Sequence, residues 1–234
     1  GTTGKPKGVV IDHGSFCASS KAFMQRMKLT RASSVFHFTS YAFDISMGGT
    51  FGALITGACI CVPSEEMRFD LPGAMNTLGA TWAFLTPSVA NIQDASAFKT
   101  LQTLVCGGEA MTPETIGTWA DKVELMNGYG PTECTIFAVA NADIPASRDH
   151  TNIGRAMNGG HTWVVDATDH NYLVPVGCVG ELLISGPIVA RGYLNDGAKT
   201  AESFIENPDW VHHFASAEDP QRPLRLYKTG DMVR

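Results

Sequence analysis

The first eight residues, GTTGKPKG, could form a loop that binds phosphate. Three glycines let the backbone turn tightly, and two threonine hydroxyls and two lysine ammonium groups supply donors. Backbone N–H groups and lysines together can surround an anion. The loop differs from the G-x-x-x-x-G-K-[ST] nucleotide loop because Gly8 follows Lys7 and no Ser or Thr comes next. An ordinary glycine turn is the alternative.

Asp44 is a carboxylate in an apolar setting. It lies between Phe43 and Ile45 and precedes a stretch without charge. An unpaired carboxylate is costly there, and a ligand ammonium group would offset the cost. The alternative is a helix N-cap, a position that Asp favours, and both roles can hold at once.

The elements that must position these residues alternate in type over the first two-thirds of the chain. Helices are predicted at residues 15–27, 47–55 and 71–78, from Pro87, and after Thr112, which is followed by Pro113 and Glu114. Strands are predicted at 35–38, 59–62, 82–85, 101–106 and 123–126. This alternation predicts an α/β fold, a mostly parallel sheet flanked by helices with ligand loops at its strand ends. Residues 45–63 carry no charge, but glycines dilute them, so we expect a buried helix and strand rather than a membrane span.

The pattern changes near Asn152. Short strands are predicted at 162–165, 181–184 and 225–227, with a helix at 200–205. We therefore expect two subdomains, an α/β part over residues 1–151 and a small β-rich part, a distorted barrel, over residues 152–234.

The bulk composition excludes some classes of protein. Of 234 residues, 44% are hydrophobic and 17% charged, which is typical of a soluble globular protein. The net charge of -6 argues against a nucleic-acid partner. Six cysteines form no C-x-x-C pair, so buried free thiols in a cytoplasmic protein are expected rather than disulfides or a metal site.

Four further motifs follow the N-terminal loop in order: YAFDIS at 41–46, NGYGPTE at 127–133, GELLISG at 180–186 running on to ARGYL at 190–194, and YKTGD at 227–231. With the loop, these resemble the core motifs of the adenylate-forming enzymes. The closest likeness is to the amino-acid-activating adenylation domains of nonribosomal peptide synthetases, over nearly the whole chain. The resemblance implies ATP-dependent activation of an amino acid as aminoacyl-AMP, with release of pyrophosphate. It also implies Mg²⁺ as a cofactor and transfer to the phosphopantetheine thiol of a carrier protein.

The resemblance also implies roles for individual residues. The loop grips the β- and γ-phosphates, Thr132 bonds the α-phosphate, and Glu133 holds Mg²⁺, a cation that prefers oxygen ligands. Tyr129 lies along the adenine ring and Asn127 reaches its edge. Asp231 accepts hydrogen bonds from both ribose hydroxyls, and Asp44 binds the substrate α-amino group. The loop residues concerned are Thr2, Thr3, Gly4, Lys5 and Lys7.

By the same resemblance, a side-chain pocket is expected from eight residues. Three are glycines and five are apolar, so the pocket favours a large hydrophobic or aromatic amino acid. Glycine also leaves room for large side chains of other kinds. They are Ile45, Gly48, Phe84, Val105, Gly107, Gly128, Ile136 and Phe137.

Two parts of the family pattern are not seen in this sequence: the residues before the loop and the C-terminal domain that carries a lysine. We therefore expect a fragment of the large N-terminal adenylation domain that is weak or inactive on its own. An acyl- or aryl-CoA ligase of the same superfamily is the nearest alternative, and Asp44 argues against it. A non-catalytic nucleotide-binding module is the other.

Overall fold

The computed structural model describes residues 7–142, 144, 148–157, 159–214 and 223–234. Its contacts divide the chain into two compact units, each discontinuous in sequence. The α/β unit comprises residues 20–130 and 139–157, and the β unit comprises 1–19, 131–138 and 158–234. The predicted division into two continuous parts, with one boundary after residue 151, therefore differs from these two units. Residues 1–19 and 131–138 join the β unit because their hydrogen bonds run to residues 188–194.

The α/β unit is built on a seven-stranded sheet of order β3-β2-β4-β5-β6-β7-β8. The strands from β3 to β6 pair in parallel, whereas β7 and β8 add to one edge in antiparallel fashion. The predicted mostly parallel sheet is confirmed. The strands are β2 (Ser34–Phe36), β3 (Cys59–Cys61), β4 (Trp82–Leu85), β5 (Thr103–Gly107), β6 (Glu124–Tyr129), β7 (Val139–Asn141) and β8 (Arg155–Ala156).

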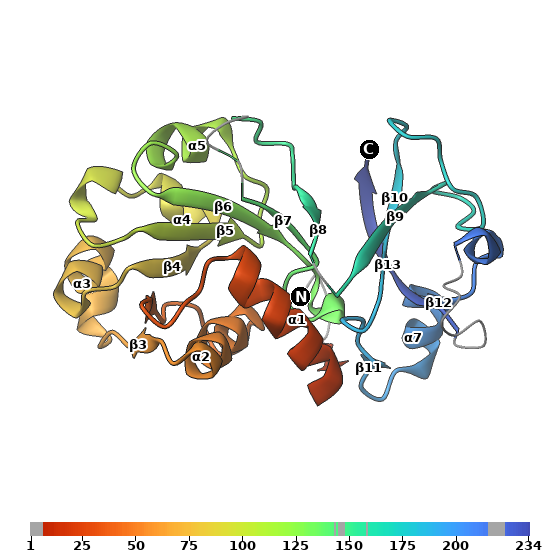
Figure 1. The fold of residues 1–234 in the computed structure, drawn as a ribbon, viewed down its shortest axis with the longest axis horizontal. Coiled ribbons are helices and arrows are strands. Elements are labelled where there is room, and N and C mark those ends of the chain that lie inside the picture. The colour runs from red at the N-terminus through yellow and green to blue at the C-terminus, as the bar shows by residue number, and fades with distance from the viewer. Residues whose placement is uncertain (1–6, 143, 145–147, 158, 215–222) are drawn as a thin grey trace. The chain divides into compact units, whose positions relative to one another are not determined.

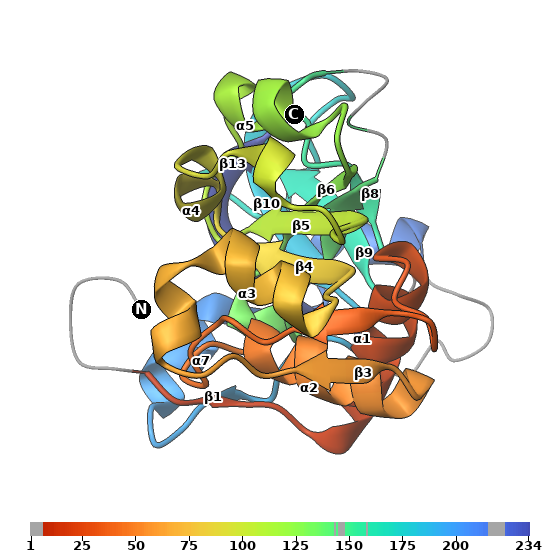
Figure 2. The ribbon, with the colours of Figure 1, turned by 90° about the vertical axis from the view of Figure 1, so that its left-hand side faces the viewer.

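The helices form where the sequence predicts them, and Figures 1 and 2 show α2 to α5 flanking the strands of the α/β unit. The charge-free run becomes α2 followed by β3, as expected, but the expected burial is only partial, because Phe51, Leu54 and Ile55 of α2 and Cys59 of β3 are exposed. No helix within the described ranges is long and apolar enough to cross a membrane. The helices are α1 (His13–Arg26), α2 (Ile45–Thr56), α3 (Leu71–Leu78), α4 (Pro87–Asn91) and α5 (Pro113–Trp119), with short 3-10 helices η1 (Glu66–Phe69) and η2 (Ala95–Ala97).

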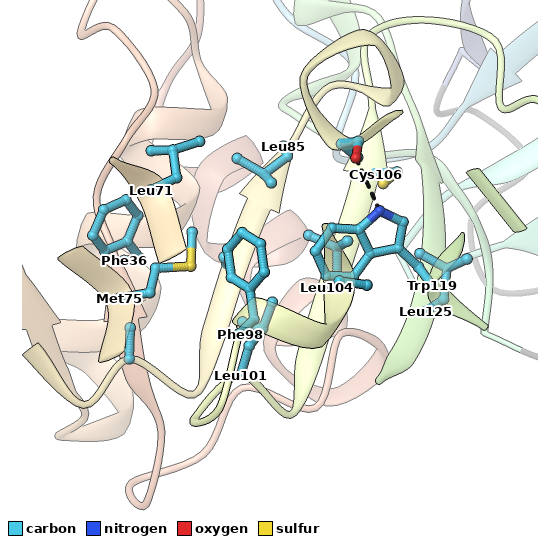
Figure 3. Close-up of a cluster of buried hydrophobic side chains, with 14 of the residues drawn as sticks. Phe36, Leu71, Met75, Leu85, Phe98, Leu101, Leu104, Cys106, Trp119 and Leu125 are labelled. Carbon is cyan, nitrogen blue, oxygen red and sulfur yellow. Dashed lines mark hydrogen bonds between the residues drawn. The ribbon is translucent and has the colours of Figure 1, made fainter. Parts of the chain in front are cut away.

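One hydrophobic core fixes the middle strands of this sheet. Leu104, Trp119 and Leu125 are fully buried. The Trp119 ring meets Phe98 edge-on at a centroid distance of 5.1 Å, and its indole N–H donates to the Ala90 carbonyl at 3.1 Å (Figure 3). The buried indole is thus both packed and hydrogen-bonded, which holds α5 and α4 together over the sheet.

Asp70 offers a simple test of the local structure. Its side chain caps α3 by accepting a hydrogen bond from the Gly73 N–H at 3.0 Å. We expect Asp70→Ala to lower the free energy of unfolding by about 1 kcal/mol, because one N-terminal N–H then loses its acceptor. Asp70→Asn should retain most of the stability, since Asn caps as well as Asp. Urea unfolding measures both, and equal stability of Asp70→Ala and the wild type would contradict the capping role.

The β unit holds a four-stranded antiparallel sheet of order β12-β13-β10-β9 and a two-stranded ribbon of β1 and β11. The expected β-rich part is confirmed; over the described residues its sheet is open, with β12 and β9 at the edges. Val165, Leu183, Trp210 and Leu226 form its core. The elements are β1 (Val9–Val10), η3 (Thr132–Cys134), β9 (His161–Val165), β10 (Gly180–Ser185), β11 (Gly192–Tyr193), α7 (Gly197–Ser203), β12 (Phe204–Glu206), η4 (Asp209–His213) and β13 (Arg225–Val233).

The helix predicted at residues 200–205 is placed too far along the chain, since α7 begins at Gly197. It ends at Ser203, and β12 begins at Phe204 because Phe204 and Ile205 pair with Tyr227 and Leu226 of β13. Aromatic and β-branched side chains suit a strand once a partner strand is present. The strands β1, β7, β8 and β11 were not predicted, and each is only two or three residues long.

The cysteine prediction holds in part. All six are free, but Cys17, Cys59 and Cys178 are exposed. Burial raises the pKa of the Cys106 thiol to about 12 and that of Cys61 to about 11, so these buried thiols stay protonated at neutral pH. Cys134 is the third buried thiol, and burial raises its pKa strongly as well.

Candidate active site

Four of the eight predicted pocket residues lie together on the neighbouring strands β4, β5 and β6, in the middle of the α/β sheet. Phe84 of β4 is opposite Val105 of β5, and Gly107 of β5 is opposite Gly128 of β6. Because side chains alternate along a strand, Val105 and Gly107 face the same side of the sheet, and their partners face it too. All four are buried. Gly107 and Gly128 add no side chain to the face that Phe84 and Val105 share.

The predicted adenine residues end β6. Asn127 is buried, and Tyr129 is half-buried at the last position of the strand. They lie on the face opposite to Gly128, since residues two apart share a face. The carboxyl end of β6 therefore divides the predicted adenine residues from the predicted substrate pocket.

Asp44 stands at the N-cap position of α2, directly before the pocket residues Ile45 and Gly48 in the first turn. Its backbone carbonyl accepts hydrogen bonds from the N–H groups of Met47 at 2.9 Å and Gly48 at 3.2 Å. Its carboxylate makes no capping hydrogen bond, and its backbone is helical, with φ −63° and ψ −27°. The side chain is half-buried. The helix start thus does not use the carboxylate, which weakens the N-cap explanation for an Asp here.

In the β unit, Glu133 lies in η3 and is held at two points by one segment. The Tyr193 hydroxyl donates to its Oε1 atom at 2.6 Å, and the Ala190 N–H donates to its backbone carbonyl at 2.8 Å. Glu133 and its neighbour Thr132 are half-buried. A carboxylate and a hydroxyl are therefore presented together on a short, anchored helix.

The turn after η3 is strained. Thr135 and Ile136 are β-branched, yet their φ angles are 55° and 78°, in the left-handed region. Two hydrogen bonds hold Thr135: its hydroxyl donates to the Ile188 carbonyl at 2.7 Å, and its carbonyl accepts from the Ser19 hydroxyl at 2.5 Å. Such strain persists where the surroundings over-determine it, often at functional sites. The turn carries the last two predicted pocket residues, Ile136 and Phe137, both of which are buried.

Asp231 is exposed and follows a tight turn in β13. Gly230 adopts a φ of 75°, and its N–H donates to the Glu181 carboxylate at 3.0 Å. The Thr229 hydroxyl donates to the Leu182 carbonyl at 2.8 Å. Glu181 therefore shapes the turn that presents Asp231.

The loop residues Thr2, Thr3, Gly4 and Lys5 lie outside the described residues. Lys7 is described and exposed, with its ammonium nitrogen 5.5 Å from the centroid of the Tyr193 ring. Lys7 and Glu133 thus meet the same side chain within the β unit, from the ring face and from the hydroxyl.

The donors of this region suit Mg²⁺ bound together with a nucleotide. Mg²⁺ usually keeps several waters and uses one or two carboxylates plus substrate phosphates. Glu133 supplies one such carboxylate, already oriented by Tyr193. Within the part of the chain that the structure describes, no group of three or more His, Cys, Asp or Glu could form an all-protein metal cage. The residues present therefore fit a metal shared with phosphate.

Two tyrosines beside Glu133 were missed by the sequence reasoning. Burial and the bond to Glu133 raise the pKa of the Tyr193 phenol, and burial with the nearby Tyr193 and Glu133 raises that of Tyr227 strongly. Both residues belong to motifs that the sequence displays, ARGYL and YKTGD. The motifs mark them, but only the structure shows that they converge on Glu133.

The comparison with known families identifies the chain. A model described as AMP-binding enzyme matches residues 1–194. The chain belongs to the AMP-binding enzyme family. The family predicted from the motifs is thereby confirmed.

Curated relatives of this AMP-binding chain are fungal nonribosomal peptide synthetases. It is 71% identical over its whole length to nonribosomal peptide synthetase 4 of Gibberella zeae. It is 46% identical over its whole length to synthetases atnA of Emericella nidulans and chyA of Penicillium rubens. The chain spans only 3% of the length of the first two relatives and 10% of the third.

A solved structure shares the fold. PA1221, an NRPS protein with adenylation and PCP domains, matches the whole chain at a TM-score of 0.80 and 28% identity, over 47% of its own length. Its holo form, bound to a vinylsulfonamide inhibitor, matches 88% of the chain at a TM-score of 0.73, over 36% of its own length. The chain therefore has the fold of part of an adenylation domain.

Proposed function

We propose that this AMP-binding chain activates an amino acid as its aminoacyl adenylate, with release of pyrophosphate, for nonribosomal peptide synthesis. Asp44 would bind the substrate α-ammonium group, and the apolar pocket would take a large hydrophobic or aromatic side chain. The observation that supports this most is that four pocket residues share one face of strands β4 to β6, in the unit that carries Asp44. They are Phe84, Val105, Gly107 and Gly128. The pocket adds no charge for a polar side chain to pair with.

The reaction joins a carboxylate to the α-phosphate, so the site must offset negative charge and align the reactants. Bound Mg²⁺ would neutralise phosphate charge and polarise the phosphoryl oxygens. Glu133 would hold that ion, and Thr132 would bond the α-phosphate. Lys7, with the other predicted residues of the loop, would contact the terminal phosphates. Asn127 and Tyr129 would bind adenine, and Asp231 would bind the ribose hydroxyls.

The partner is proposed from the relatives. PA1221 contains a PCP domain beside its adenylation domain. We infer that the adenylate made here passes to the phosphopantetheine thiol of such a carrier domain.

The deciding experiment is amino-acid-dependent ATP–pyrophosphate exchange by the longest polypeptide that carries this sequence. The panel holds aromatic, aliphatic and polar amino acids, each beside its des-amino analogue. We expect the fastest exchange with one bulky apolar amino acid, and little with its des-amino analogue. Exchange only with des-amino acids would favour an acyl- or aryl-CoA ligase and contradict the role of Asp44. Nucleotide binding without exchange across the panel would identify a non-catalytic module.

A further inference from the structure

We infer that Tyr193 is a positioning residue that orients the Glu133 carboxylate toward Mg²⁺ and fixes it relative to the end of the N-terminal loop. The inference rests on the proposed function, because it takes Glu133 as the metal ligand. It assigns a function to a side chain that the motifs alone left without one.

The first step is the contact itself. The Tyr193 hydroxyl and the Glu133 Oε1 atom are 2.6 Å apart, a short bond of the charge-assisted kind. Because an ionised carboxylate only accepts hydrogen bonds, the Tyr193 hydroxyl is the donor. With Oε1 held by the phenol, the rotation of the carboxylate is restricted, and Oε2 is set in one direction. Partners of this type orient metal ligands in many proteins.

The second step is the phenol's own support. The Tyr227 phenol lies beside the Tyr193 phenol and interacts with it. The rings of Tyr193 and Tyr227 both pack against the Phe204 ring, at centroid distances of 5.6 Å and 5.1 Å. The phenol that holds Glu133 is therefore itself held by ring packing, next to a second phenol.

The third step is the backbone of Tyr193, which joins the end of the N-terminal loop. Tyr193 pairs with Val9 in the β1–β11 ribbon, and the Leu194 N–H donates to the Gly8 carbonyl at 2.7 Å. A side chain on Gly8 would place its Cβ atom 3.2 Å from that of Leu194, so the two segments approach closely. The Tyr193 N–H donates to the Thr200 hydroxyl at 2.9 Å.

These contacts give one residue two attachments. Its backbone pairs with Val9 in the ribbon, where the next residue, Leu194, donates to Gly8, and its side chain holds the proposed metal ligand. The end of the loop and the carboxylate are thus connected through one residue. The hydroxyl makes the contact with Glu133, whereas the ring packs on Phe204. The hydroxyl is therefore the atom to remove.

The test is Tyr193→Phe in the longest polypeptide that carries this sequence, because Phe keeps the ring packing. Calorimetry would measure ATP binding over a range of Mg²⁺ concentrations and in EDTA, and electron paramagnetic resonance would measure Mn²⁺ binding with ATP present. We expect the Mg²⁺ concentration for half-maximal enhancement of ATP binding to rise about tenfold. Metal-free ATP binding should stay unchanged, and saturating Mg²⁺ should restore binding.

Two further variants keep the test decisive. Tyr172→Phe is the matched control, since Tyr172 is 66% exposed in the same unit, and it should behave as wild type. Tyr227→Phe removes the hydroxyl that supports Tyr193 and should shift the Mg²⁺ dependence in the same direction by a smaller factor. It also serves if Tyr193→Phe does not fold, which a thermal melt would reveal.

The outcomes separate this inference from the proposed function. If the wild-type protein binds ATP with no effect of Mg²⁺, the metal role of Glu133 fails. If the wild type responds to Mg²⁺ and both tyrosine variants respond identically, the positioning role of Tyr193 is wrong while the proposed function stands. Equal loss of metal-free and Mg²⁺-supported binding would also overturn it, because that pattern belongs to a structural defect.

Discussion

Asp44→Asn is expected to reduce amino-acid-dependent ATP–pyrophosphate exchange by at least about 100-fold. The substitution keeps the size of the side chain but removes the charge that pairs with the substrate ammonium group. Loss of one partner of a desolvated ion pair costs about 3–5 kcal/mol, and each 1.4 kcal/mol corresponds to about tenfold. The half-buried position of Asp44 places the effect toward the lower end of that range.

Stability should change little in Asp44→Asn, because the carboxylate makes no capping bond to α2. The matched control is Asp70→Asn, the same substitution at an Asp whose side chain does cap a helix, and it should leave exchange intact. Initial exchange rates with an amino acid and with its des-amino analogue measure the effect. An equal loss with both substrates would show that Asp44 does not recognise the amino group.

Glu133→Gln is the second large effect expected. The glutamine carbonyl can still accept the bond from the Tyr193 hydroxyl, so the local geometry is retained while the charge is lost. Since Mg²⁺ in such sites depends on one or two carboxylates, we expect exchange at physiological Mg²⁺ to fall about 100-fold. Raising the Mg²⁺ concentration should recover part of the rate, and metal-free ATP binding should persist.

The control for Glu133 is Glu202→Gln, which removes an exposed carboxylate paired with Lys199 in the same unit. An exposed pair of this kind contributes little to stability, so its exchange rate should match the wild type. Exchange measured against Mg²⁺ concentration separates the two variants. An unchanged Mg²⁺ dependence in Glu133→Gln would remove this residue from the metal site.

The fold of the α/β unit was largely readable in the sequence. Helix α3 has the predicted bounds, and Thr112 and Pro113 mark the start of α5 as expected, because caps and hydrophobic periods are local signals. The parallel sheet followed from the alternation of elements. The ribbon of β1 and β11 could not be predicted in this way, since the pairing of Val9 with Tyr193 joins residues far apart in sequence. The change from helix to strand at Phe204 could not be predicted either, because pairing with β13 overrides the helical pattern there.

The candidate site divides in the same way. The five motifs in their order were enough to identify the family, and the resemblance supplied the residues expected at the site, whose types suit phosphate, Mg²⁺ and an ammonium group. The folded structure was needed to show that the Asp44 carboxylate does not cap its helix, and that the Tyr193 hydroxyl bonds Glu133. Those contacts depend on strand register and on hydrogen bonds between distant segments. Such contacts cannot be predicted from a short-range sequence pattern, because the hydrophobic period fixes which face a side chain occupies but not which partner it meets.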